Sequence, residues 1–359
     1  MGLSSIGLDI NPAMVVVAKS RIFPVSEASS LKPLCQAVLE RSREPSGEIR
    51  ESDPLLVWFS PASAKLIRAL ERSCGKLLVD QTSEWKVDQV STLAAVFYTA
   101  LFAVVRKLAA PLRSANPTWI RTPKKLADRV RVTEKKLHTA FATTIVNFQE
   151  HIRSKQIAPF ERRSCDIRVA DATSTVPNQL VDLVLTSPPY CTRIDYAATT
   201  YIELALLQPL LNVDVDSLRS SMIGTTKVPT KEIAVSDDWG PKCTQFLKAV
   251  QSHQSKASKG YYYRTHLDYF DKMFRSLAKL SASLRAEGTA VLVVQDSYYK
   301  ELHNDLPGIV TEISERHGLA FRRRVDFQSK ACMSRVNTRA AAHSTRVGST
   351  ESVLCFSKQ

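Results

Sequence analysis

The chain lacks the residue patterns that mark metal, redox and membrane proteins. Its seven cysteines are scattered and form no Cys-x-x-Cys pair, which argues against a zinc ribbon or a redox motif. An odd, dispersed set of thiols instead fits the reducing cytoplasm. The first residues lack the basic flank and apolar run of a signal peptide, and no stretch approaches the length of a membrane span.

Acidic residues are also in short supply. Lys and Arg number 49 against 35 Asp and Glu, which gives a net charge of +14. Such a surplus favours a polyanionic partner, with nucleic acid ahead of a membrane surface. Residues 106–155 hold twelve basic and three acidic residues, and Trp119 lies there in a proline-containing loop. We expect a surface that binds a nucleic-acid backbone, with Arg121, Lys124 and Lys125 as contacts; a solvated helical face is the open alternative.

Short apolar runs alternate with helical patterns along the chain. Strands are predicted at 5–10, 166–171, 181–186, 289–296, 321–327 and 352–358. Helices are predicted after the capping pair Asn11-Pro12, over much of 61–156, at 199–211, at 265–285 before Gly288, and at 305–318 with Gly318 as the stop. This alternation predicts an α/β fold with a doubly wound sheet.

The predicted organisation has five segments. They are a strand and helix of the core (1–24), a mostly helical insertion (25–164), the central part of the core (165–211), a polar insertion (212–261) and the C-terminal part of the core with antiparallel final strands (262–359).

The stretch DLVLTSPPYCTRIDYA, residues 182–197, carries the clearest chemical signal. Strand-forming residues end there in Ser187-Pro188-Pro189-Tyr190. The prolines have no N–H and fix φ, so they hold backbone carbonyls still. Ligands of such sheets bind beyond the carboxyl ends of the strands. A planar ring with an amino group fits this corner: the ring stacks on Tyr190, and the amino hydrogens go to Ser187 and the Pro188 carbonyl.

The T-S-P-P-Y sequence resembles the catalytic motif of S-adenosylmethionine-dependent DNA methyltransferases that modify amino groups. The resemblance implies catalytic roles for Ser187, Pro188, Pro189 and Tyr190, and a target base that leaves the DNA double helix. Serine in the first position is typical of cytosine-N4 enzymes, whereas adenine-N6 enzymes more often carry Asp or Asn. An adenine-N6 enzyme, an RNA or protein-glutamine methyltransferase and an inactive DNA-binding subunit remain open alternatives.

The same resemblance implies a binding site for S-adenosylmethionine. Asp9, in GLDINP, is similar to the acid that holds the ribose hydroxyls, and Asp171-Ala172 is similar to the acid that contacts the adenine amino group. The expected cofactor contacts are Asp9, Ile10, Asp171, Ala172 and Thr186. The expected DNA contacts, besides those in 106–155, are Arg193 and two arginines of an acid-free loop, Arg335 and Arg339. No metal is expected in this chemistry.

Two other base-modifying chemistries are excluded by missing motifs. No Pro-Cys dipeptide is present for a cytosine-C5 enzyme, and no His-x-Glu with Cys-x-x-Cys is present for a zinc deaminase.

Glycine is the last conspicuous absence. In this fold a glycine-rich turn lies about 20 residues before the ribose-binding acid, but only eight residues precede Asp9 and no Gly-x-Gly occurs anywhere. We therefore expect a separate polypeptide to supply the first strand and its glycine turn, so that this chain is the larger part of a split enzyme. A misplaced start, a truncated gene or a loss of activity are the open alternatives.

Overall fold

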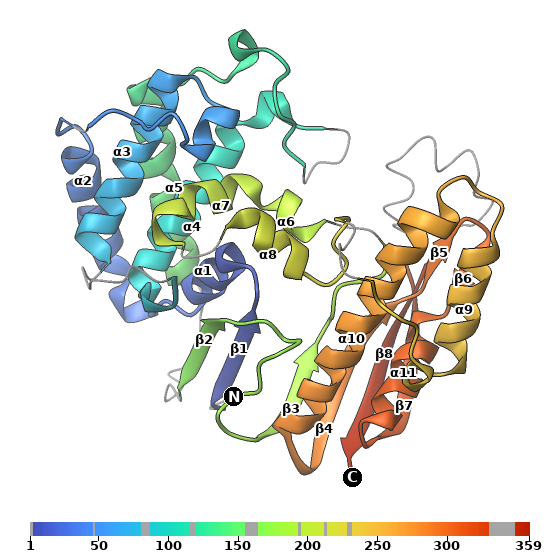
Figure 1. Cartoon of the computed structure of the whole chain (residues 1–359). Helices are drawn as coiled ribbons and strands as arrows, with labels where there is room; N and C mark the ends of the chain where they lie inside the picture. The colour runs from blue at the N-terminus through green and yellow to red at the C-terminus, as the bar shows by residue number, and fades with distance from the viewer. Residues whose placement is uncertain are drawn as a thin grey trace. The chain divides into compact units, whose positions relative to one another are not determined.

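The computed structural model describes residues 3–45, 47–79, 87–114, 119–154, 164–192, 195–211, 214–227, 232–329 and 349–359. These residues form a mixed α/β protein with two compact units (Figure 1). The first unit comprises Met1–Val169 and Ala198–Val215, and the second comprises Ala170–Ala197 and Asp216–Gln359. The predicted α/β class is confirmed, and the five-segment organisation stays a prediction.

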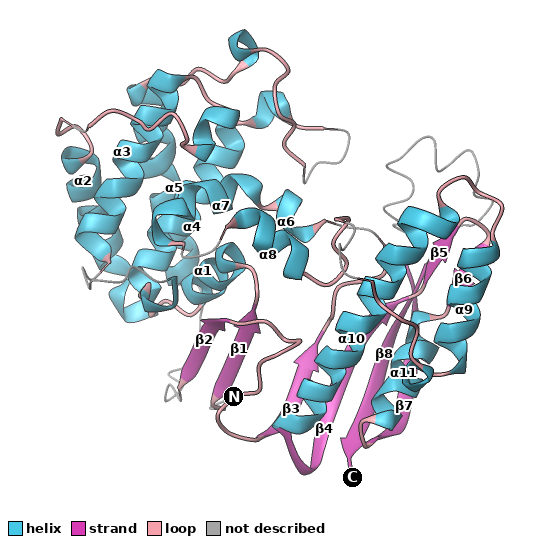
Figure 2. Cartoon of the chain, viewed as in Figure 1, coloured by secondary structure: helices cyan, strands magenta, loops and turns pink. Residues whose placement is uncertain are grey.

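The first unit is mainly helical (Figure 2). Its α-helices are α1 (Pro12–Arg21), α2 (Leu31–Arg41), α3 (Pro61–Leu78), α4 (Thr92–Leu108), α5 (Glu134–Ser154) and α7 (Tyr201–Leu207). Its 3₁₀ turns are η1 (Val25–Ser30), η2 (Pro54–Val57), η3 (Val87–Gln89), η4 (Ala110–Leu112), η5 (Leu126–Asp128) and η6 (Gln208–Leu210). Strands β1 (Ser5–Asp9) and β2 (Cys165–Val169) pair in parallel. The predicted start of α1 is confirmed, because the Asn11 side chain accepts a hydrogen bond from the Ala13 amide.

A buried ion cluster ties α3 to α7 in the first unit. Arg68 is 4% exposed, and its nitrogens lie 3.0 Å from Asp53 and 3.2 Å from Glu71. The same guanidinium donates to the carbonyl oxygens of Ala205 and Leu206, both at 3.0 Å. Arginine presents five donors in a fixed fork, so one side chain can satisfy all four of these groups.

The second unit is built on a four-stranded mixed sheet with the order β3-β4-β8-β7. Strands β3 (Val181–Thr186) and β4 (Leu284–Gln295) are parallel. Strand β8 (Ser349–Lys358) pairs antiparallel with both β4 and β7 (Leu319–Ser329), which confirms the predicted antiparallel end. The remaining elements are α8 (Val215–Ser221), η7 (Asp237–Trp239), α9 (Pro241–Ser252), the π-turn η8 (Ser258–Tyr262), α10 (Tyr263–Ser283), β5 (Ser297–Tyr299), β6 (Leu302–Asn304) and α11 (Leu306–Arg316).

One face of this sheet carries the core of the second unit (Figure 1). Ala290, Leu292 and Val294 alternate along β4 and are fully buried with residues of α9, α10 and α11. The other face is more open, since Leu183 and Leu185 of the edge strand β3 are 53% and 70% exposed. The strands of the chain pair in three separate sheets within the described residues, so the doubly wound arrangement stays a prediction.

Three details differ from the sequence-based expectations. Gly288 does not close the long helix; α10 ends at Ser283, and Gly288 lies inside β4, where a side chain would press on the Arg285 carbonyl. The helix expected at 199–211 is divided into α6 (Tyr196–Thr199), α7 and η6. The short β5–β6 hairpin was not predicted, because each strand has only three residues.

Candidate active site

The predicted catalytic corner lies at the carboxyl end of β3. Thr186, the last residue of β3, pairs with Leu292 of the parallel strand β4. The Ser187 hydroxyl then donates to the carbonyl oxygen of Val293, at 3.1 Å. Because the Ser187 hydroxyl donates its only proton to Val293, both lone pairs of its oxygen can accept hydrogen bonds. Ser187 is exposed and is therefore suited to accept a hydrogen from an incoming N–H group.

Tyr190 is held by a residue of β8, the strand on the far side of β4 from β3. Its hydroxyl donates to Oε1 of Glu351 on β8, at 2.5 Å, and the Ser187 hydroxyl lies 3.4 Å from the same phenol oxygen. Burial raises the pKa of Tyr190, and the hydrogen bond to Glu351 raises it further. The phenol therefore stays protonated at neutral pH, and its ring is fixed in one orientation.

The two proline carbonyls of the corner have different environments. The carbonyl of Pro189 accepts a hydrogen bond of 2.7 Å from the hydroxyl of Tyr269, a residue of α10 that is only 2% exposed. The carbonyl of Pro188 has no hydrogen-bond partner among the described residues. The Pro188 carbonyl is thus an unused acceptor, whereas the Pro189 carbonyl anchors the corner to the core.

The loop that contains Gly224 packs against Pro189 and Tyr190 of the corner. Gly224 has φ +77°, and a β-carbon there would lie 3.7 Å from the carbonyl oxygen of Tyr190. This loop is tied down by Asp195, which is 1% exposed and accepts hydrogen bonds from Arg219 at 2.6 Å and Thr226 at 2.8 Å. The ion pair between Asp195 and Arg219 thus holds this loop in place.

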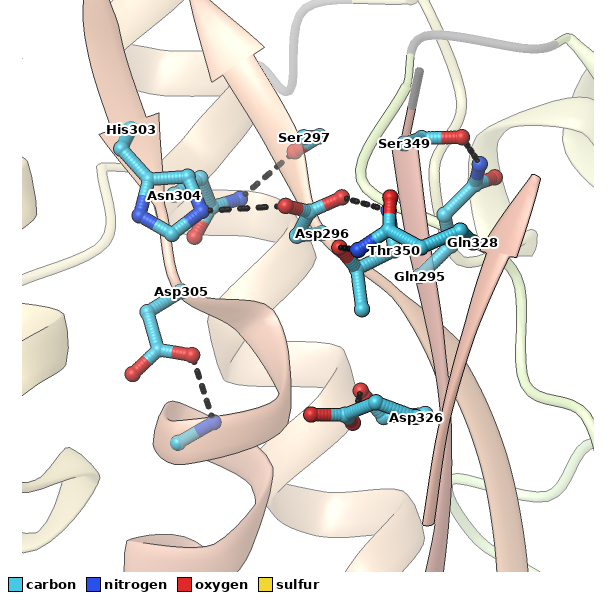
Figure 3. A network of polar contacts seen from close by, with 12 residues as sticks. Gln295, Asp296, Ser297, His303, Asn304, Asp305, Asp326, Gln328, Ser349 and Thr350 are labelled. Atoms are coloured by element: carbon cyan, nitrogen blue, oxygen red, sulfur yellow. Dashed lines mark hydrogen bonds and ion pairs between the residues drawn. The ribbon is translucent and has the colours of Figure 1, made fainter. Parts of the chain in front are cut away.

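A network of polar contacts joins the ends of β4 and β8 (Figure 3). Asp296 accepts a hydrogen bond from the Thr350 amide at 2.8 Å, and its other carboxylate oxygen lies 3.2 Å from Nε2 of His303. The Gln295 side chain donates to the Ser349 hydroxyl. These contacts fix the start of β8, where Glu351 meets Tyr190. Asp296 therefore joins the end of β4 to the start of β8.

Cys191 follows the corner directly but is not a nucleophile. Burial raises the pKa of its thiol to about 12, so the reactive thiolate is absent at neutral pH. Its side chain is partly buried and packs against the core of the second unit.

The predicted cofactor residues lie on both units. Asp9 and Ile10 follow β1 in the first unit, and Asp171 and Ala172 follow β2 but belong to the second. One carboxylate oxygen of Asp9 accepts the Asn11 amide, and one oxygen of Asp171 accepts the Thr173 amide, each at 2.8 Å. Each aspartate thus caps its own turn. The second oxygen of each makes no hydrogen bond with the described residues, which leaves an acceptor for a ligand hydroxyl or amino group.

The predicted nucleic-acid contacts are only partly visible. Arg121, Lys124 and Lys125 are exposed in the first unit. Arg193, Arg335 and Arg339 lie outside the described residues.

Within the described part of the chain, no group of three or more His, Cys, Asp or Glu side chains could hold a metal ion. None of the described helices combines the length and apolar character needed to cross a membrane.

Comparison with protein-family models, characterised proteins and solved structures gives no match.

Sequence reasoning missed two residues of this site, Tyr269 and Glu351. Tyr269 follows the core-facing spacing of a long helix, and Glu351 is one polar residue at the start of a final strand. Neither position carries a local signal that points to the corner.

Proposed function

We propose that this chain is a DNA methyltransferase that modifies an exocyclic amino group, with N4 of cytosine as the favoured acceptor. The observation that carries the proposal is the pair of unused acceptors at the corner. They are the Ser187 hydroxyl, whose proton goes to Val293, and the partner-free carbonyl of Pro188. An amino group presents two hydrogens, which two acceptors can hold at once.

The corner residues would act on the amino group by positioning and polarisation. An exocyclic amino nitrogen is a poor nucleophile, because its lone pair is delocalised into the ring. Hydrogen bonds to Ser187 and Pro188 would draw the nitrogen toward a tetrahedral form and localise that lone pair. Tyr190, fixed by Glu351, offers an aromatic face on which the extruded base can stack. No covalent bond between enzyme and base is required, and the proton that the methylated nitrogen loses would pass to water.

Bound S-adenosylmethionine would supply the methyl group. The resemblance implies that Asp9, Ile10, Asp171, Ala172 and Thr186 would hold it, and Asp9 and Asp171 each keep one carboxylate oxygen that makes no hydrogen bond with the described residues. The chain contains no closely spaced glycine pair. A second polypeptide would therefore supply the glycine-rich turn and its strand to a doubly wound sheet.

The test is transfer of tritiated methyl from S-adenosylmethionine to unmethylated double-stranded DNA. The chain would be assayed alone and with the product of the reading frame just upstream. We expect label on DNA only in the mixture, loss of that label with Ser187→Ala, and N4-methylcytosine after digestion to nucleosides.

The other outcomes separate the alternatives. Detection of N6-methyladenine would indicate the same reaction on adenine instead of cytosine. Label on RNA alone would indicate an RNA methyltransferase. Label with the chain alone would refute the split enzyme. DNA binding without label in any mixture would identify a non-catalytic subunit.

A further inference from the structure

The first unit carries a second surface feature that the catalytic corner does not use. We call it the basic hairpin, and it consists of residues 112–114 and 119–131. Arg113 pairs with Ile120 in an antiparallel bridge. The Ser114 amide donates to the Trp119 carbonyl at 3.0 Å, and the Arg121 amide donates to the Leu112 carbonyl at 2.8 Å. The backbone of Trp119 is therefore held on both sides.

The far end of the basic hairpin is anchored to the core of the unit. The Val130 amide donates to the Trp58 carbonyl at 2.9 Å, and the Ser60 amide donates to the Val130 carbonyl at 3.0 Å. Phe59, which lies between these contacts, is fully buried. The basic hairpin is thus attached to the core of the first unit through the backbone of Val130.

The charge of the basic hairpin is almost entirely positive. It contains one acidic residue, Asp128, and six basic residues, Arg113, Arg121, Lys124, Lys125, Arg129 and Arg131. None of the six forms an ion pair with a described residue, and all but the half-buried Arg129 are exposed. Uncompensated cations on one segment attract a polyanion and release its counterions. A neutral protein partner would have to desolvate these charges without pairing them, which is unfavourable.

Trp119 stands out among these charges. It is 40% exposed, whereas the other described tryptophans, Trp58 and Trp239, are 5% and 2% exposed. An indole beside arginines and lysines is the combination that stacks on a base while the cations contact its phosphates. Stacking requires a base whose face is open, and bases inside an intact duplex are covered by their neighbours.

We propose that the basic hairpin binds unpaired nucleic acid, with Trp119 stacked on a base and Arg121, Lys124 and Lys125 at the phosphates. This binding needs neither a cofactor nor methyl transfer. It goes beyond the proposed function, because it involves neither the catalytic corner nor the predicted cofactor residues. It rests on that function only for the choice of DNA over RNA.

The test is binding of the full chain to a fluorescent 20-nucleotide single strand, by anisotropy, without S-adenosylmethionine. We expect Trp119→Ala to weaken binding about 5- to 150-fold, because one stacked base contributes about 1–3 kcal/mol. Trp119→Phe should retain most of the affinity. Binding to the matched duplex should change less than about threefold in both variants. A single-stranded RNA of the same sequence, run in parallel, shows which nucleic acid is preferred.

The charge contribution has its own variants. The double change Lys124→Ala/Lys125→Ala should reduce the slope of log K against log salt by about 1–2, since each phosphate contact on a single strand contributes about 0.7. Lys32→Ala/Lys76→Ala is the matched control, because it removes two exposed lysines of the same unit from outside the basic hairpin and should leave the slope unchanged.

Single-strand binding that Trp119→Ala leaves unaltered would overturn the proposal, as would an equal loss on single strand and duplex. Failure of methyl transfer with this pattern intact would refute the proposed function alone.

Discussion

Among the described residues, the hydroxyl of Tyr269 is the one side-chain group of the core that donates a hydrogen bond to a proline carbonyl of the corner. Tyr269→Phe removes this hydroxyl and keeps the ring. The lost contact is a 2.7 Å hydrogen bond from a residue that is 2% exposed. A hydrogen bond of this kind contributes about 1 kcal/mol, and an acceptor left without a partner adds to the cost, so we expect a loss of about 1–2 kcal/mol.

Two measurements check this expectation. Calorimetry should show the melting temperature of the second unit lowered by roughly 2–8 °C, the shift that this energy produces in a unit of this size. Hydrogen exchange should speed up at the Thr192 amide, which donates to the Tyr190 carbonyl at 2.7 Å and reports on the corner itself.

The matched control is Tyr263→Phe, on the same helix. Its hydroxyl makes no hydrogen bond with the described residues, so its stability should stay within about 0.5 kcal/mol of the wild type. If Tyr269→Phe unfolds like the wild type, or if both variants lose the same stability, the Tyr269–Pro189 bond does not anchor the corner.

Three further predictions concern the site and its supports. Glu351→Ala should lower the methyl-transfer rate about tenfold by freeing the Tyr190 ring, while Glu351→Gln, which can still accept the phenol proton, should stay within about threefold; equal losses would refute a positioning role. Arg68→Ala should destabilise the first unit by about 3–5 kcal/mol in urea unfolding, because it leaves buried carboxylates unpaired; a loss below about 1 kcal/mol would contradict this. Gly224→Ala should cost about 1–2 kcal/mol because of its positive φ, whereas Gly260→Ala, with open space around it, should be nearly neutral in the same thermal scan.

The sequence by itself determined the elements whose signals are local. Asn11-Pro12 fixed the start of α1, because a cap and its helix are neighbours in the chain. The apolar run before Ser187 identified β3 to the residue, and Gly318, with φ +76°, follows the end of α11 as predicted. The chemistry of the corner could also be proposed from sequence, because proline acts on its own backbone.

Only the tertiary structure decided what surrounds that corner. Glu351 is 161 residues from Tyr190, and Tyr269 is 80 residues from Pro189. Their meeting depends on the order and register of β3, β4 and β8, which set which side chains stand opposite one another. The division of the predicted cofactor and catalytic residues between two compact units was equally invisible in the sequence, since local patterns do not encode which helices share a core.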